Sequence, residues 1–390
     1  MPMSDWKEYK FSDFVNINPT VSLNGKEEYS YVEMKDLQNG NKICSPSAER
    51  KVASGARFQE RDTLFAKITP CLENGKICQV RGLKNGVGFG STEFLVFRGK
   101  QDISDNDYVF YLSRWDEVRG FAEGNFEGTS GRQRVPKNCF DNLLLELPDV
   151  KEQIQIASIL NGLDDKIDLL HRQNKTLEQL AETLFRQRFV EEEEVSWQKG
   201  KVDDAISVKG GTTPSTAKPE FWNGNFHWTS PRDLSNHNSV FLFDTERKIS
   251  ELGLKEIGSG LLPIGTVLLS SRAPIGYLAI TEIPLAINQG YIAMLADKLV
   301  SNFFIYLWCK ANMPDIENAG NGSVFQEISK SSFRELDFTI PPKEKLKMFD
   351  NEIEPLFQKI KSNATQIRTL TKLRDTILPK LMSGEVMVKM

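Results

Sequence analysis

Cysteine and histidine are scarce in this 390-residue sequence, which contains only five cysteines and three histidines. The cysteines form no CxxC pair, and an odd, scattered set is typical of reduced thiols in a cytosolic protein. The histidines form no HExxH motif, and a zinc site at His227 and His237 would lack further ligands. We therefore expect no metal site and a cytoplasmic location.

Long apolar runs are also missing. No uninterrupted run approaches the ~18 residues of a transmembrane helix, and the start, Met1 to Lys10, is too polar for a signal peptide. The hydrophobic share of 39% and the charged share of 26% are ordinary for a folded globular protein. At ~150 residues per domain, the length predicts two or three domains.

The motifs of the common enzyme classes are absent. No Gly-Lys pair is followed by Ser or Thr, which excludes a phosphate-binding P-loop, and no GxSxG motif indicates a hydrolase. The Asn/Asp-Pro-Pro-Phe/Tyr tetrapeptide of an amino-methyltransferase is missing. The nearest match to a nuclease motif is Glu33-Met34-Lys35, three residues of common type. We expect no catalytic residue in this chain.

The net charge of −4 excludes a uniformly basic nucleic-acid binder, so any contact with DNA must come from local patches.

The strongest positive signal is an internal repeat with an offset of 191 to 197 residues. Trp6, Lys10 and Asp13 recur as Trp197, Lys201 and Asp204, and the segment from Tyr108 to Leu112 matches that from Phe303 to Leu307. At offset 193, Gln133, Val135, Lys137, Phe140, Leu143 and Leu147 match Gln326, Ile328, Lys330, Phe333, Leu336 and Ile340. The protein therefore consists of two diverged copies of one unit.

Each copy divides into a globular part, residues 1–148 or 195–341, and a following helix, residues 149–194 or 342–390. The globular parts carry short apolar runs between turn residues, which predict an α+β (mixed α/β) fold. We expect strands at 64–68, 94–97, 267–269 and 291–295, and short helices at 108–115 and 303–310.

Each of the two long helices carries an apolar pattern with a seven-residue repeat, which is typical of a coiled-coil seam. Packing of each helix against its own globular part is the alternative. Gly162 and Pro355 occupy equivalent positions, where we expect a kink or a restart. The predicted seam consists of Leu160, Leu163, Ile167, Leu170, Asn174, Leu177, Ala181 and Leu184 in the first helix and Ile353, Leu356, Ile360, Asn363, Ile367, Leu370, Arg374 and Ile377 in the second.

Charge favours pairing of the first helix with the second. Residues 149–194 carry 6 Lys+Arg and 11 Asp+Glu, whereas residues 342–390 carry 10 and 6. Opposite charge on equivalent helices disfavours self-pairing between molecules, although two solvated faces could also have drifted apart. Asn174 and Asn363 lie in the seam and could fix its register, because a buried amide needs a partner.

This tandem arrangement resembles the specificity subunit of type I restriction–modification systems, and the resemblance covers the whole chain. It is carried by Gly128-Thr129-Ser130 with Gln133, by the Phe65 to Lys76 segment, and by the helix start at Leu163-Asp164-Asp165-Lys166-Ile167. The second copy has Gly322-Ser323 with Gln326, then Ile340-Pro341-Pro342. Its linker departs from the family pattern, with Lys345-Leu346 where the first copy has Glu152-Gln153.

The resemblance implies that each globular part is a target recognition domain for one half of a bipartite, asymmetric DNA site. It implies that the paired helices form an antiparallel coiled coil that separates the domains and docks two methyltransferase subunits. These partners would bring S-adenosylmethionine, and restriction subunits would bring ATP and Mg; this chain would hold no cofactor. A helix of about 25 residues is roughly 40 Å long, which suits half-sites one ~34 Å turn of DNA apart.

Recognition of base edges needs Arg or Lys for guanine, Asn or Gln for adenine, and small hydroxyl side chains, carried on loops. For any one such residue a solvated surface position is the alternative. Lys35 and Arg232 are matched cations beside Asp36 and Asp233, so an ion pair competes with a phosphate contact there. The candidates are Lys67, Thr69, Thr92, Thr129, Arg132, Gln133 and Arg134 in the first copy and Arg232, Arg272, Asn288, Gln289, Ser323 and Gln326 in the second.

A different class of function stays open, namely a tandem-repeat scaffold whose domains bind proteins instead of DNA.

Overall fold

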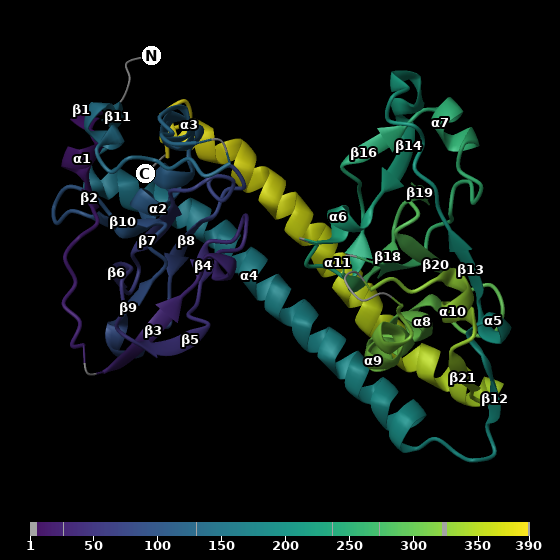
Figure 1. Ribbon diagram of the computed structural model, residues 1–390. Coiled ribbons are helices and arrows are strands. Elements are labelled where there is room, and N and C mark those ends of the chain that lie inside the picture. Colours follow the sequence, from purple (N-terminus) through teal and green to yellow (C-terminus); the bar gives the residue numbers. More distant parts are fainter. Residues whose placement is uncertain are drawn as a thin grey trace. The chain divides into compact units, whose positions relative to one another are not determined.

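The computed structural model describes residues 6–25, 27–129, 131–235, 237–272, 274–321 and 326–388. The chain divides into two compact units. Unit 1 comprises Met1–Leu169 and Ile367–Met390, and unit 2 comprises Leu170–Gln366. Each unit therefore contains one globular part and a segment of each long helix (Figure 1). No helix in the described ranges is long and apolar enough to span a bilayer.

Unit 1 is built on a five-stranded sheet, a four-stranded sheet and a two-stranded ribbon, in the orders β2-β10-β7-β8-β4, β5-β3-β9-β6 and β1-β11. The strands are β1 (Lys7–Lys10), β2 (Val15–Ile17), β3 (Glu28–Val32), β4 (Ile43–Cys44), β5 (Ala48–Lys51), β6 (Ala56–Gln59), β7 (Thr63–Ala66), β8 (Ile77–Val80), β9 (Val87–Gly90), β10 (Phe94–Gly99) and β11 (Leu144–Leu147). The short helices are α1 (Phe11–Phe14), η1 (Met34–Asp36), η2 (Lys84–Gly86), α2 (Asn106–Arg114), α3 (Asp116–Gly124) and η3 (Cys139–Asn142).

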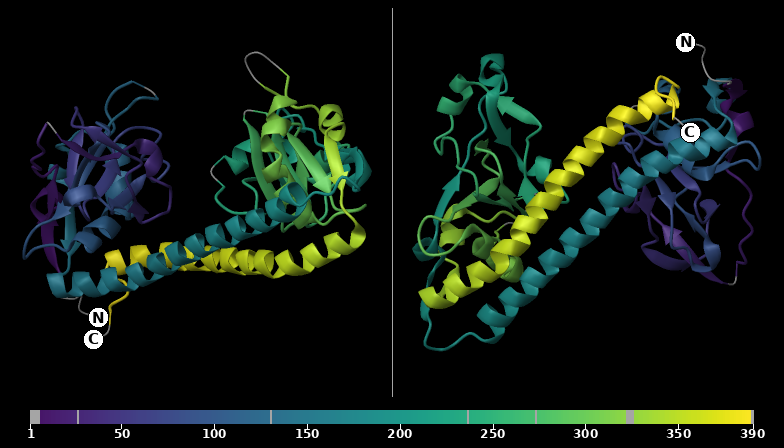
Figure 2. Two further views of the ribbon diagram at one scale, coloured as in Figure 1. Left: turned by 90° about the horizontal axis from the view of Figure 1, so that it is seen from below. Right: turned by 180° about the vertical axis from the view of Figure 1, so that it is seen from behind.

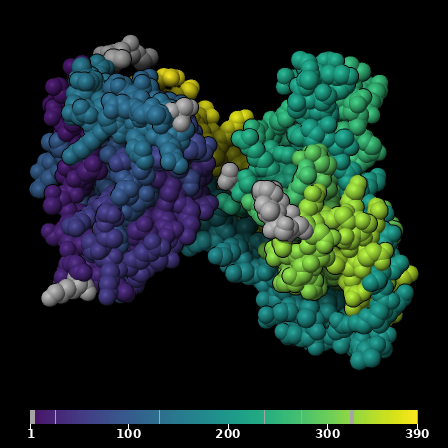
Figure 3. Space-filling model, viewed as in Figure 1, coloured from purple at the N-terminus to yellow at the C-terminus, as the bar shows by residue number. Residues whose placement is uncertain are grey.

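The five-stranded sheet of unit 1 is covered on both faces, which explains its continuous apolar strands. Leu64 and Val96 point into a core shared with the four-stranded sheet. Their neighbours Phe65 and Leu95 point the other way, into a core with α2 and the long helices. In Figure 3 the visible face of unit 1 is formed mostly by the purple and blue residues of this globular part.

Unit 2 repeats this plan, with sheet orders β13-β20-β17-β18-β15, β16-β14-β19 and β12-β21. The parallel pairs also correspond: β4–β8 matches β15–β18, and β3–β9 matches β14–β19. The elements are β12 (Gln198–Lys201), α5 (Val202–Ala205), β13 (Ser207–Gly210), η5 (Pro219–Phe221), β14 (Trp222–Thr229), α6 (Pro231–Leu234), β15 (Phe241–Leu242), β16 (Arg247–Ile249), α7 (Glu251–Lys255), β17 (Val267–Ser271), β18 (Ile275–Thr281), β19 (Leu285–Ile287), β20 (Tyr291–Leu295), α8 (Asn302–Ala311), α9 (Met313–Asn318), α10 (Lys330–Arg334) and β21 (Asp337–Ile340).

The repeat and the mixed α/β class are thus confirmed, and the predicted short strands and helices coincide with β7, β10, β17, β20, α2 and α8 to within two residues.

The long helices are α4 (Val150–Arg186), which continues as a π-turn η4 (Gln187–Glu191), and α11 (Lys343–Met382). Both run unbroken through Gly162 and Pro355, so the predicted restart was wrong. A glycine costs a helix only about 1 kcal/mol relative to alanine. Asn351 is exposed, so water can bond the carbonyl oxygen that Pro355 leaves without a donor.

Polar contacts between α4 and α11 show that the helices pair antiparallel within each unit. In unit 1, Arg374 Nη1 lies 2.6 Å from Asp164 Oδ1. In unit 2, Asn363 Nδ2 donates to Asn174 Oδ1 over 2.9 Å, so the two seam amides are hydrogen-bonded to each other. Further along, Arg188 pairs with Glu352 at 2.6 Å. In both views of Figure 2 the start of α4 lies beside the yellow end of α11.

The predicted seam residues are all buried or half-buried in the structure. Leu160 also belongs to the core of unit 1, and Ala181, Ile353 and Ile360 belong to that of unit 2. The helices therefore pack against each other and against the globular parts, so both interpretations of the apolar pattern apply.

The Arg374–Asp164 pair in unit 1 joins three parts of the chain. The two side chains are 2% and 3% exposed. Tyr111 of α2 donates to the other oxygen of Asp164 over 2.8 Å, and Arg374 also donates to the carbonyl oxygen of Gly40 over 2.8 Å. Burial alone would lower the pKa of Arg374, but the carboxylates of Asp164 and Asp375 raise it. Arg374 is therefore held in its charged form, and both side chains have hydrogen-bond partners in the globular part as well as each other.

A second polar cluster lies around Asp107 of α2. Its carboxylate accepts from Arg61 at 2.9 Å, Gln79 at 2.9 Å and Lys42 at 3.3 Å. Lys42 also bonds Asn161 of α4. Burial would raise the pKa of Asp107, but the cations and hydrogen bonds outweigh it and lower the pKa to about 2. The cluster fixes α4 to the five-stranded sheet.

Arg374→Ala should destabilise unit 1 by ~3 kcal/mol or more, because it leaves the Asp164 carboxylate buried without its cation. Calorimetry on the full chain measures this as a lower melting temperature of one transition. Lys372→Ala, an exposed change two residues earlier, is the control and should shift it little. Equal shifts for the two variants would contradict the importance of the pair.

Acid should weaken unit 1 through Asp107. Because the folded pKa is lowered to about 2 from the model-compound value of 3.8, the stabilisation is present above pH ~4 and is lost as the pH falls towards 2. Asp107→Asn should therefore lower the melting temperature at pH 7 and flatten its dependence between pH 4 and pH 2. If the melting temperature of the variant falls between pH 4 and pH 2 as steeply as that of the wild type, other carboxylates control the loss of stability in acid.

Candidate nucleic-acid interface

The segment after α3 in unit 1 forms a short hairpin that projects from the globular part. Glu127 and Arg134 exchange both backbone hydrogen bonds, at 2.9 and 2.8 Å. Gly128 and Gly131 have φ angles of 113° and 78°, a region that favours glycine. The glycines thus allow the tight turn whose exposed residues include Thr129 and Arg132.

The hairpin is anchored on the chain that leaves β7. The Gln133 N–H donates to the hydroxyl oxygen of Thr69 over 3.1 Å, and the Thr69 N–H donates to the carbonyl oxygen of Gln133 over 3.0 Å. The Val135 N–H donates to the carbonyl oxygen of Lys67 over 2.8 Å. Thr69 is buried and serves this anchor, whereas Lys67 is half-buried at its edge.

The turn between β9 and β10 completes the site in unit 1. The Lys67 N–H donates to the carbonyl oxygen of Glu93 over 2.9 Å. The Glu93 carboxylate accepts from Nε and Nη2 of Arg134 at 2.8 to 2.9 Å. These bonds lower the pKa of Glu93 and raise that of Arg134. Thr92, beside Glu93, is exposed at the tip of the turn.

Unit 2 builds the same site from different residues. Asn321 and Glu327 exchange backbone hydrogen bonds at 3.0 and 3.1 Å, as Glu127 and Arg134 do in unit 1. The Ile328 N–H donates to the carbonyl oxygen of Ser271 over 3.0 Å, which repeats the anchor of the first hairpin. Arg272 Nη1 lies 3.8 Å from Glu327 Oε2. In unit 2 the hairpin therefore carries the acidic member of the ion pair, and its partner, the cation, directly follows the strand end β17, whereas the partner in unit 1 lies on the turn.

The turn between β19 and β20 corresponds to that between β9 and β10. The Asn288 side chain caps the Gly290 N–H at 2.9 Å, as the Ser91 side chain caps that of Glu93 at 3.1 Å. Gln289 is exposed at the tip, equivalent to Thr92, and its Oε1 accepts from the Thr213 hydroxyl at 2.7 Å. A strand end, a turn and a hairpin therefore converge in both units.

The structure brings the predicted site residues of unit 1 together on these three segments. In unit 2, Arg272, Asn288, Gln289 and Gln326 lie on the equivalent segments, whereas Ser323 lies outside the described residues. Arg232 is exposed on α6, next to the Pro231 ring that packs close to Gly290. Lys35, its counterpart, pairs with Glu33 at 2.6 Å, which favours the ion-pair interpretation there.

Glu93 and Glu327 are the site residues that the sequence did not indicate. Glu93 fixes the Arg134 side chain, which turns a predicted base-contacting arginine into part of the hairpin's support. The two residues are 41 positions apart, and no local pattern links them. Arg132 and Arg134 are both exposed on the first hairpin, but of the two only Arg134 has an ion-pair partner among the described residues.

No group of three or more His, Cys, Asp or Glu side chains suited to a metal ion occurs among the described residues.

A family model for the type I restriction modification DNA specificity domain matches the chain twice, over residues 3–179 and 194–372. The chain belongs to this family. Its two specificity domains coincide with the two copies of the internal repeat.

Two relatives illustrate the range of similarity. The specificity subunit of the type I restriction enzyme HindI of Haemophilus influenzae is 24% identical over 98% of this chain and 100% of its own length. That of MjaIX from Methanocaldococcus jannaschii is 36% identical over 44% of this chain and 42% of its own. The structure is similar to the crystal structure of a type I restriction–modification S subunit from M. genitalium, at 14% identity, a TM-score of 0.52, and coverage of 99% of this chain and 97% of the other. That likeness supports the fold.

Glu93→Gln should loosen the hairpin of this specificity domain, because the bidentate ion pair with Arg134 is lost. Backbone hydrogen exchange of Glu127 and Arg134 should accelerate modestly, because an exposed ion pair contributes little to stability. Glu327→Gln is the matched change in unit 2. It should have a smaller effect on its own hairpin, because Arg272 is 3.8 Å away. Unchanged exchange in Glu93→Gln would show that backbone bonds alone hold the hairpin.

Proposed function

We propose that this chain is the non-catalytic specificity subunit of a type I restriction–modification enzyme, in which each globular part recognises one half of a bipartite, asymmetric DNA site. The paired helices set the spacing of the two domains and dock two methyltransferase subunits. The double match to the DNA specificity domain supports DNA recognition by both halves.

The observation that carries the proposal is the site built twice from a strand end, a turn and a hairpin. The architecture is the same in both units, but the exposed residues differ: Thr92 is replaced by Gln289, and Arg132 lies on the first hairpin. Base recognition depends on these side chains. Two sites with the same backbone arrangement but different exposed side chains therefore favour two different half-sites. A protein-binding scaffold would not need this combination.

The charge of the chain favours DNA binding in a complex over binding alone. The globular parts 1–148 and 195–341 have net charges of −1 and −2. Much of the affinity for DNA comes from neutralising phosphates, so the isolated chain should bind weakly and the assembled enzyme tightly. In this proposal methyltransferase subunits supply S-adenosylmethionine chemistry and restriction subunits supply ATP- and Mg-dependent cleavage, all in the cytoplasm.

A methylome tests the proposal. The gene is expressed with its neighbouring methyltransferase gene in a methylation-free host, and N6-methyladenine is mapped by long-read sequencing. A split, asymmetric motif that appears only with both genes is expected. Unchanged methylation, with both proteins folded and associated, would exclude DNA recognition and leave the scaffold.

Variants of the two sites should act on separate halves of the motif. Arg132→Ala should weaken or relax recognition of one half-site, and Gln289→Ala that of the other, each by ~1–3 kcal/mol if the side chain contacts a base edge. Lys51→Ala, an exposed change on β5, is the control. If both variants altered recognition of the same half-site, the proposal that each unit recognises a different half of the target would be contradicted.

A further inference from the structure

The helices α4 and α11 have diverged in sequence but share two short patterns. The first, Leu163-x-x-Lys166-Ile167, recurs at offset 193 as Leu356-x-x-Lys359-Ile360, and its leucine and isoleucine lie in the seam. The second is longer and reaches beyond the seam. Thr176-Leu177-x-x-Leu180-x-x-Thr183 in α4 recurs at offset 193 as Thr369-Leu370-x-x-Leu373-x-x-Thr376 in α11. Three of the four positions between them differ in charge or size, with Glu178, Gln179 and Ala181 in one helix and Thr371, Lys372 and Arg374 in the other; the fourth is acidic in both, as Glu182 and Asp375. Something other than general helix composition has preserved the pattern.

Packing of the two helices explains only part of this identity. Leu177 and Leu370 lie in the seam and are half-buried. Leu180 and Leu373 are 45% and 46% exposed, and the four threonines are exposed as well. Residues spaced by four and three lie on one side of a helix. We name Thr176, Leu180 and Thr183 patch A, in unit 2, and Thr369, Leu373 and Thr376 patch B, in unit 1.

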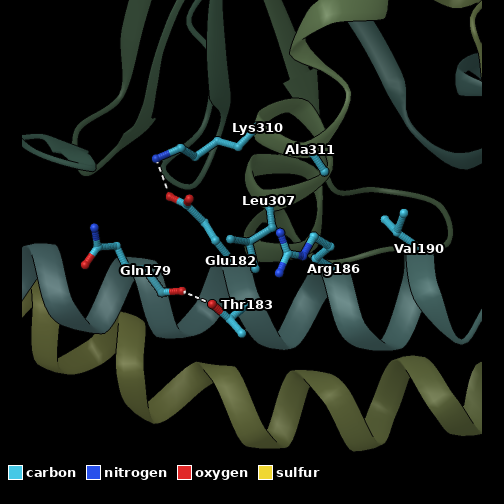
Figure 4. A pocket seen from close by; sticks show the side chains of 8 residues that line it. All are labelled: Gln179, Glu182, Thr183, Arg186, Val190, Leu307, Lys310 and Ala311. Atoms are coloured by element: carbon cyan, nitrogen blue, oxygen red, sulfur yellow. Dashed lines mark hydrogen bonds and ion pairs between the residues drawn. The ribbon is translucent and has the colours of Figure 1, made fainter.

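Both patches present mainly apolar groups. The hydroxyls of Thr176, Thr183 and Thr376 donate to the carbonyl oxygen four residues earlier, at 3.1, 2.8 and 2.7 Å. These hydroxyls are therefore engaged within the helix, and the threonines offer their methyl groups beside the exposed leucine. Patch A also borders a groove of about 460 Å³ between α4 and α8 (Figure 4). Its lining is mixed: Thr183, Val190, Leu307 and Ala311 alternate with the polar side chains of Gln179, Glu182, Arg186 and Lys310.

Exposed positions in the two copies of a duplicated chain drift apart unless the same contact constrains both. The seam does not cover either leucine, and exposure of a leucine side chain to water is energetically unfavourable. The flanking charges differ, because the residue before each leucine is Gln179 in patch A and Lys372 in patch B. The two patches share an exposed leucine and the methyl groups of the threonines beside it. A partner that binds one patch should therefore resemble the partner that binds the other.

We propose that patches A and B are two equivalent docking points for two copies of one partner, the methyltransferase subunit, each of which places an apolar side chain against the exposed leucine. The inference rests on the proposed function and adds to it the residues that hold each copy. One partner copy sits on unit 2 through Leu180, and the other sits on unit 1 through Leu373.

The test is the number of methyltransferase subunits bound, measured by native mass spectrometry on the full chain co-expressed with the neighbouring methyltransferase. The wild-type chain should carry two. Leu180→Glu and Leu373→Glu should each carry one, with the lost copy bound at least tenfold more weakly, and the double variant should carry none. Leu180→Met, which keeps the position apolar, should restore two copies.

Met348→Glu is the matched control, since Met348 is 63% exposed on α11 but corresponds to Gln155 in α4. It should retain two copies, and melting temperatures close to that of the wild type confirm that all variants fold. Single leucine variants that keep two copies at wild-type affinity would overturn the docking points while leaving the proposed function intact. A wild-type chain that binds no methyltransferase subunit would overturn both.

Discussion

The structure depends on the antiparallel register of α4 and α11, which a few buried polar contacts fix. An apolar seam alone tolerates a shift along the helix axis, because one leucine fills a gap much as the next does. The Arg374–Asp164 pair does not, since a shift in either direction would leave a buried charge without its partner. Tyr111 and Gly40 bond the same pair, so the globular part of unit 1 is fixed to the same register.

The two copies of the repeat differ at the positions of the Arg374–Asp164 pair. At offset 193, Asp164 corresponds to Phe357 and Arg374 corresponds to Ala181, and both of these apolar residues lie in the core of unit 2. One copy thus has a charged pair where the other has a large and a small apolar residue. Two first helices paired antiparallel would set Asp164 against Ala181, which offers the carboxylate no cation. The divergence of the copies therefore favours pairing of the first helix with the second and penalises self-pairing.

Much of this organisation was predictable from the sequence, because local periodicity and the internal repeat determine it. The long helices, the position of Asn174 and Asn363 in the seam and strands such as β10 follow from spacing alone, whereas the antiparallel direction of the helices was an expectation from the family resemblance. Arg374 was predicted as a seam residue and is buried there, but nothing local shows that Asp164 lies opposite it. Arg134 looked like a free cation for the same reason, since Glu93 reaches it only once β10 and the hairpin have folded. The ion-pair partners of such side chains lie far away in the sequence, so local patterns could not indicate them.

The two-stranded ribbons have a consequence for how such a chain changes over time. β1 pairs with β11 through Lys7 and Leu147, and β12 pairs with β21 through Gln198 and Ile340. Each globular part therefore begins and ends at one place, directly before a long helix starts. A recombination event with both breakpoints in the ribbon would exchange the whole globular part and leave the helices and their register as they were. A new DNA target could then be acquired in one step, with the rest of the assembly unchanged.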